Sequence, residues 1–486
     1  MADLVSTDDR NTYPVNPCYA QTCIMGISES VSDYFDVQEH GSSVRTELLA
    51  GLTTFLTMSY IVVVNPAILM GAISIEGYSE GQIMSMLAIV TIIAAAVATF
   101  IMAVYANRPF AQAPGLGLNA FFAITVVGVL GVPWQTALAA VVVEGIVFIL
   151  LTAIGAREYV INLFPEPVKF AVGTGIGLFL AIIGLQAMGI VVDDPATLVG
   201  LGAVAADPVA IVSVFGLFLT LALYARGVPG SIIIGIVATT VIGWLATAFG
   251  PVAADAGLVA GGMSATYDIT PLAGAFLSGF GNVEAFSFAL IVFTFFFVDF
   301  FDTAGTLVGV GQAGNFLDEN GDLPDIDKPL MADAVGTTVG GMLGTSTVTT
   351  YIESATGVEE GGRTGLTALT VAALFVASLA IVPLATAIPQ YASHIALVVI
   401  GVVMIQNVVD IDWSDLTNVI PAGLTILVMP FTYSIAYGIA AGIVSYPVIK
   451  LAAGEREDVR IGHWMLAGAF VVYFVVRTGG VLAAQV

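Results

Sequence analysis

A succession of apolar segments, each long enough to cross a lipid bilayer as a helix of about 20 residues, dominates this chain of 486 residues. The chain is 58% hydrophobic with a mean hydropathy of +0.98, which predicts a polytopic membrane protein. Segments of spanning length occupy 47–71, 84–104, 136–154, 168–190, 208–225, 231–249, 286–311, 366–388, 393–408, 416–431, 434–451 and 463–482. Shorter or glycine-interrupted stretches occupy 111–129, 330–344 and 347–358, and such discontinuous segments indicate a transporter's binding site.

Basic residues orient these segments in the membrane. Counting every apolar segment up to residue 451 gives fourteen crossings, and a cytoplasmic N-terminus then places eleven of the twelve Lys and Arg residues inside. The exception, Arg477, lies in the last apolar segment, whose status as a crossing stays open. The sequence therefore predicts an all-α, multi-pass protein of the cell membrane with a cytoplasmic N-terminus.

The charge balance is strongly acidic, with 36 Asp and Glu residues against 12 Lys and Arg and a net charge of −24. Such a surface repels nucleic acid and suits concentrated salt, where screening removes self-repulsion, so we expect a halophilic source. Residues 1–43 form a polar acidic tail without a cleavable signal peptide, and we expect this tail to be loosely ordered. Its Cys18 and Cys23 lack companion His or Cys residues, so we assign them no metal or disulfide.

Carboxylates interrupt the apolar sequence in several spans. Asp299 and Asp302 are three residues apart and share a helix face, and Glu353 begins a half-helix. An ionised carboxylate at mid-bilayer costs about 2.5–3.5 kcal/mol, so acids kept there indicate a function by default. The alternative is that an acid such as Asp302 or Asp333 only caps or pins neighbouring helices. Glu144 is either a structural acceptor for backbone or hydroxyl donors, which we favour, or a member of a relay.

An internal repeat relates the two halves of the chain. A shift of 234 residues places Asn65 on Asp299 and Asn119 on Glu353, and it aligns two extended stretches that each enter a half-helix. Seven crossings per half is an odd number, which predicts an inverted repeat, unless the alignment reflects chance. The predicted parts are an acidic tail at 1–43, a first repeat at 44–249, an extracellular connector at 250–282, a second repeat at 283–452, and a basic segment with an extra apolar helix at 453–486.

Several long motifs resemble those of one transporter family. The segments TELLAGLTTFLTMSYIVVVNPAIL, APGLGLNAFFA, FVDFFDTAGTLVGV, TSTVTTYIESATGVEEGGRTGLTA and LVMPFTYSIAYGIAAGI are similar to the AzgA-type hypoxanthine–guanine–adenine permeases of the xanthine/uracil permease (nucleobase–ascorbate transporter) superfamily. The resemblance covers about residues 40–450. It implies fourteen transmembrane spans in a seven-plus-seven inverted repeat, divided into core and gate domains, with short strands in broken spans 3 and 10.

The same resemblance implies a purine site. The family's substrate-binding positions fall on Asn119, Asp299 and Glu353, with Asp302 required nearby. A further acidic position in span 13 finds no secure match, Asp415 being only a candidate. The span-8 histidine of the uracil branch is absent, so no histidine proton relay is expected.

The chemistry of a purine nucleobase fits these residue types. Ionised carboxylates accept hydrogen bonds from ring N–H groups, whereas the Asn119 amide can serve either a donor or an acceptor edge. Phe121, Phe300 and Tyr351 lie close in sequence to the polar groups and could sandwich the ring. Ordinary packing is the commoner role for aromatic side chains in such segments.

The sequence thus predicts a secondary-active importer of purine nucleobases (hypoxanthine, guanine, adenine) that works by proton symport. Asp299 and Asp302 are the predicted coupling residues, because two acids one turn apart repel and one of them should hold a proton. No enzyme motif, cofactor or metal site is expected. The expected partners are the substrate, a proton or Na+, the lipid bilayer and, as a candidate assembly, a second copy of the chain.

Rival functions follow from the same pattern. An anion transporter or channel of the related sulfate-permease architecture could share the fold, although carboxylates at the half-helices argue against an anionic substrate. A Na+-coupled nucleobase symporter is the other alternative, since carboxylates and carbonyls at unwound helices also bind Na+. An intramembrane aspartyl protease is disfavoured because both acids share one helix and no GxGD motif occurs.

Overall fold

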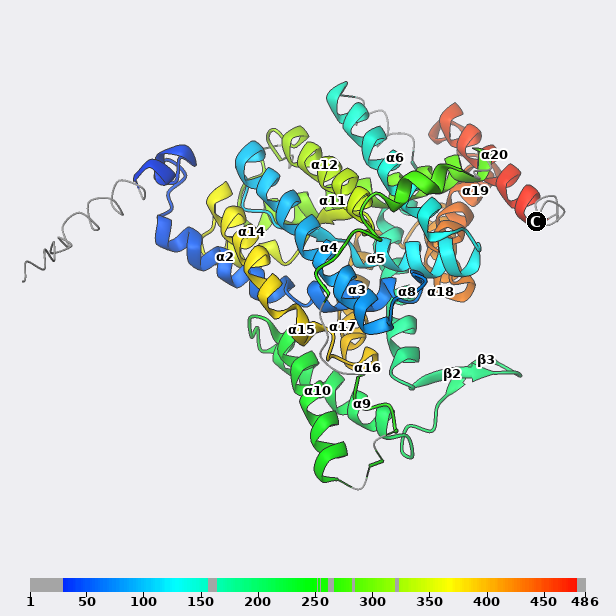
Figure 1. Ribbon diagram of the computed structural model, residues 1–486. Coiled ribbons are helices and arrows are strands. Elements are labelled where there is room, and N and C mark those ends of the chain that lie inside the picture. Colours follow the sequence, from blue (N-terminus) through cyan, green and yellow to red (C-terminus); the bar gives the residue numbers. More distant parts are fainter. Residues whose placement is uncertain are drawn as a thin grey trace, which may run out of the picture.

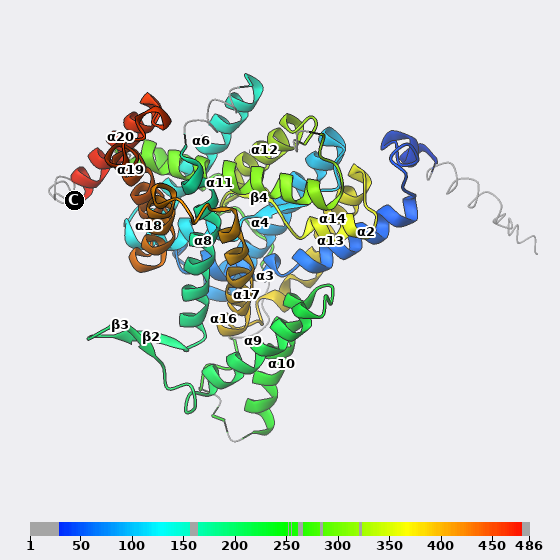
Figure 2. The same cartoon turned by 180° about the vertical axis from the view of Figure 1, so that it is seen from behind.

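The protein, described here by a computed structural model, is helical apart from two small antiparallel sheets. The described residues are 29–155, 164–250, 252–253, 255–260, 266–281, 285–319 and 323–478. Cys18, Cys23 and the rest of 1–28 lie outside them, as do residues 479–486 of the predicted C-terminal segment. Figures 1 and 2 show helices that cross around a central region, where the strand β4 is visible from behind.

Breaks in the first half of the chain produce short helices at the centre of the fold. Asn107 adopts a left-handed conformation with φ +47° and ends the π-helix η1, just before the first strand. The elements of this half are α2 (Val44–Met58), α3 (Ile61–Leu69), α4 (Glu80–Ile101), η1 (Met102–Ala106), β1 (Gln112–Pro114), α5 (Leu116–Ala120), the π-helix η2 (Phe121–Val129), α6 (Trp134–Ala153), α8 (Glu166–Ala187), β2 (Val191–Asp194), β3 (Leu198–Leu201), α9 (Pro208–Ala225) and α10 (Ser231–Phe249).

The second half begins with the longest described helix, which carries the two predicted coupling acids. This α11 (Ala285–Ala313) follows a short 3₁₀ turn, η3 (Ala275–Phe280). The remaining elements are α12 (Asp327–Leu343), β4 (Val348–Thr350), α13 (Ser354–Glu359), α14 (Gly365–Ser378), η4 (Leu379–Ile381), α15 (Val382–Ala385), α16 (Gln390–Ser393), α17 (Ile395–Met404), η5 (Ile405–Asp410), α18 (Leu416–Thr432), α19 (Ile435–Ala453), η6 (Arg456–Asp458) and α20 (Ile461–Thr478).

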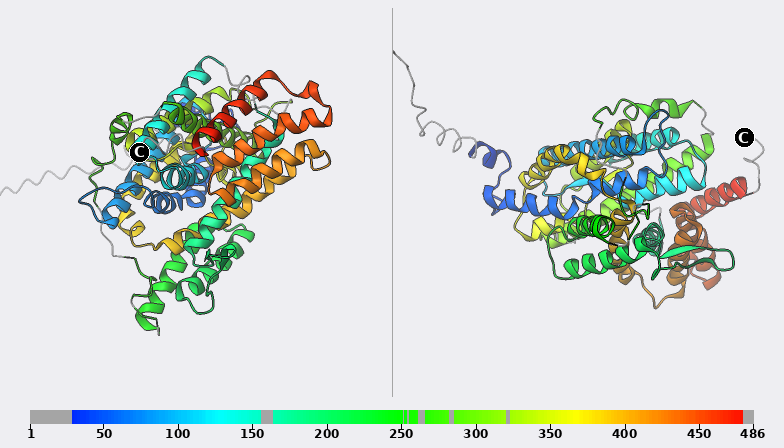
Figure 3. Two further views of the ribbon diagram at one scale, coloured as in Figure 1. Left: turned by 90° about the vertical axis from the view of Figure 1, so that its right-hand side faces the viewer. Right: turned by 60° about the horizontal axis from the view of Figure 1, so that its bottom comes forward.

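Two groups of helices pack around different neighbours. The first surrounds the strand pair β1–β4 and contains α3, α4, α6, α11, α12 and α14. In the second, α8 packs against α17, α18 and α19, while α9 packs against α10 (Figure 3). The sheet formed by β2 and β3 is a hairpin that projects from the body of the molecule (Figure 1). The strand pair therefore lies inside the first group, where water does not compete for its hydrogen bonds.

The last part of the predicted tail is packed, contrary to the expectation of a loosely ordered segment. Phe35 and Val37 are buried and contact Leu366 at the start of α14. Asn107 adds a hydrogen bond of 3.2 Å from Nδ2 to the Phe35 carbonyl oxygen. Apolar side chains within a polar stretch thus fix residues 29–43 against the helical body.

The length and apolar character of the helices make this a multi-pass membrane protein. Within the described residues, ten helical stretches are long and apolar enough to span a bilayer. Four predicted crossings are not among these ten: the two segments that contain the strands β1 and β4, and the helices α12 and α18. All four have helices of 17 residues or fewer. A segment that begins as a strand covers part of the membrane in an extended form, so helix length alone misses it. The count of fourteen stays a prediction.

Candidate functional site

The strands β1 and β4 form the frame of the candidate site. They pair antiparallel with Gln112 opposite Thr350 and Pro114 opposite Val348, and all their residues are buried. Each strand is followed within a few residues by a half-helix, α5 after β1 and α13 after β4, as the sequence predicts for these two segments. The residue after β1 is Gly115, and the close approach of the other strand favours glycine there. A Cβ at this position would lie 2.6 Å from Cγ2 of Thr349, closer than two carbon atoms normally approach.

Asn119, in the half-helix α5, is held against the strand pair. Its Nδ2 lies 3.3 Å from the Pro114 carbonyl oxygen, and its Oδ1 accepts a hydrogen bond from the Ser346 hydroxyl. The Tyr351 hydroxyl donates to the same Pro114 oxygen at 2.5 Å, from the end of the other strand. The structure therefore brings together two predicted site residues, Asn119 and Tyr351, from the two halves of the chain.

Glu353 lies at the start of the other half-helix, α13, where it is the N-cap residue. Its Oε1 accepts a hydrogen bond of 2.6 Å from the hydroxyl of Tyr60, which stands at the break between α2 and α3. Asp302 acts electrostatically on Tyr351 together with Glu353, so these side chains share one region. Sequence reasoning missed Tyr60, because a tyrosine in an apolar segment carries no signal of its distant partner.

Asp299 is completely buried and faces a different set of groups. Its Oδ2 accepts a hydrogen bond of 3.3 Å from Thr337 of α12, whereas its Oδ1 has no donor among the described residues. The acids that act on it most strongly are Asp333 and Glu144, ahead of Asp302. The predicted site acids thus form a series: Asp302 acts on Glu353 and also on Asp299, and Asp299 in turn faces two further buried acids.

Asp333 of α12 anchors the strand pair. Its Oδ1 accepts hydrogen bonds from Gln112 Nε2 at 3.1 Å, Thr303 Oγ1 at 2.9 Å and Thr350 Oγ1 at 3.3 Å. These donors belong to β1, α11 and β4, so one carboxylate ties three elements to a fourth. These contacts fit the structural alternative given above for Asp333, in which the acid only pins neighbouring segments together.

Two of the predicted aromatic residues are packed among other apolar side chains. Phe121 makes an edge-to-face contact with Phe295, with ring centroids 4.8 Å apart. Phe300 packs against Phe148 and Phe296 at 5.6 and 5.8 Å. Packing against other aromatic rings accounts for the positions of Phe121 and Phe300. Their role in stacking on a purine stays a prediction.

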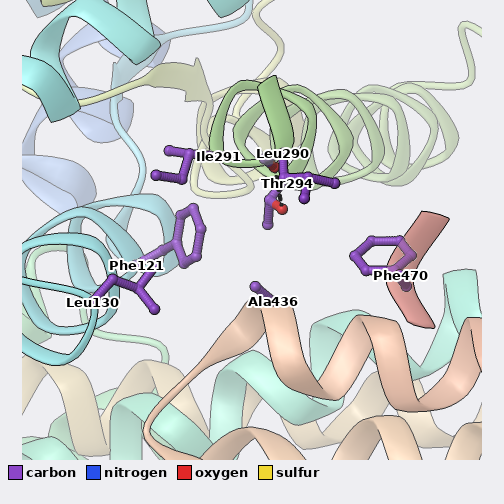
Figure 4. A pocket seen from close by; sticks show the side chains of 7 residues that line it. All are labelled: Phe121, Leu130, Leu290, Ile291, Thr294, Ala436 and Phe470. Atoms are coloured by element: carbon purple, nitrogen blue, oxygen red, sulfur yellow. Dashed lines mark hydrogen bonds between the residues drawn. The ribbon is translucent and has the colours of Figure 1, made fainter. Parts of the chain in front are cut away.

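A small apolar cavity beside Phe121 is not the candidate site. Figure 4 shows its lining side chains, which come from η2 and the residue that follows it, and from α11, α19 and α20. Its volume of about 10 Å³ accommodates roughly one water molecule and no purine. None of the predicted site acids lines it; the lining residues are Phe121, Leu130, Leu290, Ile291, Thr294, Ala436 and Phe470.

Asp415, the candidate for the span-13 acid, lies at a helix end. It caps α18 through a hydrogen bond of 2.8 Å from the Thr417 backbone N–H, and its Oδ2 lies 3.6 Å from Lys450 Nζ. Hydrogen bonds from the Thr417 side chain and backbone, followed by the charge of Lys450, lower the pKa of Asp415. These contacts explain Asp415 as a helix cap, and none of them connects it to the strand pair.

A fold of crossing apolar helices with two broken segments, and polar side chains buried where those segments meet, defines a membrane transport protein. The chain belongs to the Permease family, whose sequence model matches residues 45–441, and so to the xanthine/uracil permease superfamily that its motifs resemble. Membership of this family makes the protein a permease and not an enzyme.

Curated relatives cover nearly the whole chain. A putative permease of Methanocaldococcus jannaschii is 43% identical over 456 residues, which is 93% of this chain and 100% of that protein. The adenine permease AdeP of Escherichia coli is 38% identical, covering 94% of this chain and 97% of its own. The guanine/hypoxanthine permease PbuO of Bacillus subtilis is 39% identical, with 91% and 99% covered.

Solved structures share the fold at low sequence identity. The transmembrane domain of the cyanobacterial bicarbonate transporter BicA superposes with a TM-score of 0.55 and 17% identity, covering 84% of this chain and 97% of that one. The SLC26A9 structure gives a TM-score of 0.59 and 11% identity, covering 93% and 73%. At these identities the likeness concerns the fold alone.

Proposed function

We propose that this permease transports purine nucleobases across the membrane. The relatives named as adenine and as guanine/hypoxanthine permeases support this substrate class. The observation that carries the proposal is the placement of Glu353, a carboxylate acceptor at a half-helix inside the membrane region, beside Asp302. A purine presents N–H donors on a flat ring, and carboxylates are the side chains that accept them.

Glu353 and Asn119 hold complementary edges of the base in this proposal. The Glu353 carboxylate accepts one bond from Tyr60 and retains lone pairs for a ring N–H, in a charge-assisted bond about twice as strong as a neutral one. Asn119 donates one of its two amide N–H groups to Pro114, so the other can meet a carbonyl or ring nitrogen. Asp299 supplies a further acceptor, Oδ1.

The finer organisation is part of the same proposal. It comprises fourteen spans in a seven-plus-seven inverted repeat, with the parts bounded as the sequence predicts. The antiparallel pairing of β1 with β4 supports this organisation, because the two strands belong to segments that a shift of 234 residues aligns. The helices around the strand pair would form the core, and α8–α10 with α17–α19 the gate. The distribution of Lys and Arg supports a cytoplasmic N-terminus.

Import by proton symport is the proposed mode of transport. Neutral nucleobases gain nothing from the membrane potential alone, so uphill uptake needs a coupling ion. Buried carboxylates that lie beside the substrate positions can bind a proton when the substrate binds and release it on the other side. The sequence assigns this role to Asp299 and Asp302, and the contacts of Asp299 with other buried acids support the first of them.

Anion transport is the second candidate, because the bicarbonate transporter BicA shares the fold. A bound anion needs donors or positive charge around it. Near the start of the half-helix α13 lie instead the carboxylates of Asp302 and Glu353, which repel an anion. We therefore rank this candidate second.

Uptake of labelled hypoxanthine into proteoliposomes tests these proposals. Excess adenine and guanine should compete, whereas uracil, sulfate and bicarbonate should not. A pH gradient at fixed Na+ should drive accumulation, and a protonophore should abolish it. Inhibition by sulfate or bicarbonate without any purine effect would establish the anion function instead, and accumulation driven only by a Na+ gradient would replace the proton by Na+.

A further inference from the structure

Glu144 is a buried acid for which the described part of the chain supplies no hydrogen-bond donor. The residue is completely buried in the middle of α6, and neither Oε1 nor Oε2 has a partner. Its carboxyl group faces that of Asp299, with Asp333 as the next acid. The structural role that the sequence favoured, an acceptor for backbone or hydroxyl donors, is therefore wrong.

The packing of α6 fixes this arrangement on both sides. At Gly145 the helix lies against the α12 backbone so closely that a Cβ would be 2.7 Å from the Thr338 amide nitrogen. One turn later, Phe148 packs on Phe296 and Phe300, the aromatic residues that flank Asp299 on α11. Glu144 is thus held where α6, α11 and α12 meet.

Four carboxylate oxygens without donors meet at this place. They are both oxygens of Glu144, Oδ1 of Asp299 and Oδ2 of Asp333. A buried carboxylate without a donor or a counter-charge is strongly unfavourable, and two facing carboxylates repel. A single proton between two carboxyl groups removes one charge and creates an O–H···O⁻ hydrogen bond, the short and strong type.

We propose that Glu144 and Asp299 share one proton and together form the site of the coupling proton. The proposal rests on the proposed proton symport and deepens it. A proton fits better than a metal ion, since no group of three or more His, Cys, Asp or Glu in the described residues is arranged to hold one. The other ionisable groups that act on the pair, Asp333 and Asp302, are acids and favour the uptake of a proton.

The shared proton links substrate binding to proton binding. With Glu144 protonated, its O–H donates to Asp299 and fixes that carboxylate as an acceptor for a purine N–H. Loss of the proton leaves two repelling carboxylates and disorders the acceptor. Purine affinity should therefore rise as the pH falls, by up to about tenfold per pH unit for one linked proton.

The test compares Glu144→Gln with a matched control in full-length protein reconstituted into liposomes. The amide that this substitution introduces can donate to Asp299 at every pH, so Glu144→Gln should lose the rise of hypoxanthine affinity with falling pH that the Glu144–Asp299 proton causes in the wild type. It should retain hypoxanthine exchange and lose accumulation driven by a pH gradient. Glu144→Asp should restore a pH dependence.

Glu47→Gln is the control, because Glu47 is an equally buried glutamate whose oxygens do have donors. Its carboxylate accepts from the backbone N–H groups of Arg363 and Thr364 and from the Thr367 hydroxyl. Glu47→Gln should lower thermal stability and leave the pH profile of binding intact. A structural role for Glu144 would give that same pattern in Glu144→Gln and would overturn the proposal.

A second measurement detects the shared proton directly and begins with the wild-type protein. Infrared difference spectra of the wild type should contain the carbonyl stretch of a protonated carboxyl group at neutral pH, and Glu144→Gln or Glu144→Asp should remove or shift it. The absence of such a band in the wild type overturns the shared proton. If the wild type transports no purine the proposed function itself fails, whereas purine uptake with an unchanged Glu144→Gln pH profile refutes the proton pair only.

Discussion

The hydroxyl oxygen of Tyr60 lies 2.6 Å from Oε1 of Glu353, within the short range of hydrogen bonds to an ionised acceptor. Tyr60 stands at the break between α2 and α3, and Glu353 at the start of α13. The bond therefore connects the first membrane segment with the second half-helix. It orients the carboxylate that we propose to bind the purine.

Tyr60→Phe should weaken hypoxanthine binding by about tenfold, because a hydrogen bond to a charged group contributes about 1.5–3 kcal/mol and the carboxylate loses its orientation. Equilibrium binding to purified protein measures the change. Tyr105→Phe, at an exposed tyrosine of η1, is the matched control and should bind like the wild type. Equal affinities of Tyr60→Phe and wild type would separate Tyr60 from substrate binding.

Asp299→Ala and Glu353→Ala should each lower purine affinity by roughly ten- to over a hundredfold, since each removes an acceptor for a substrate N–H. Asn119→Ala should weaken binding less, because the lost bond joins neutral groups. The elution volume and thermal unfolding of each variant check that it remains folded. Wild-type affinity in Asp299→Ala would show that the acid lies outside the substrate site.

Asp333→Ala should destabilise the protein by at least about 3 kcal/mol, because it leaves the buried donors of Gln112, Thr303 and Thr350 without their acceptor. Thermal unfolding in detergent records the loss. The control is Asp325→Asn, which removes the charge of an exposed ion pair with Lys328 worth about 0–1 kcal/mol and keeps a residue type that tolerates the left-handed backbone at this position. Similar melting temperatures for the two variants would contradict the role of Asp333 as the anchor of the strand pair.

Single cysteines at Ala196 and Glu319 test the orientation in the membrane. Both positions are exposed, on the β2–β3 hairpin and in the loop after α11. In a variant without Cys18 and Cys23, Ala196→Cys should react with a membrane-impermeant maleimide on intact cells, and Glu319→Cys only after permeabilisation. The reverse pattern would overturn both the topology and the inverted repeat.

The Asp415 cap should make stability depend on pH in acid. The pKa of Asp415 is lowered in the folded state, so its contribution is present above the unfolded value of about 3.9 and is lost as the pH falls through the folded value. Melting temperatures of wild type and Asp415→Asn should therefore converge below about pH 4, because Asn caps a helix without titrating. A constant difference between the two proteins across this range would remove Asp415 from the acid response.

Local sequence predicted the broken segments but not what they contact. Pro114 and Gly115, and the threonines before Glu353, disfavour helix, and the observed strands occupy those positions. Glu353 stands at the start of its half-helix, as predicted, and Asn119 lies within the other half-helix, α5. The change from an extended strand to a helix could be predicted from the sequence, because it depends on residues that are neighbours in the chain.

Contacts between distant segments could not be read from the sequence. Tyr60 and Glu353 are 293 residues apart, and nothing around either residue identifies the other. The role of Glu144 was misjudged for the same reason, because only the packing of α6 on α11 and α12 reveals that its carboxyl faces another acid and no donor. The π-helix η2 was also unexpected, since its apolar sequence is equally compatible with an α-helix.

The pairing of β1 with β4 has a consequence for the biogenesis of the protein. Each strand finds its hydrogen-bond partner only in the other half, so β1 leaves the ribosome more than 200 residues before β4 exists. Until then its backbone polar groups cannot be satisfied within the membrane, where an unpaired group costs several kcal/mol. Insertion of the first half and assembly of the substrate site are therefore separate events. An early-terminated chain can enter the bilayer but cannot complete either half-helix entrance, and it should be a substrate for membrane quality control.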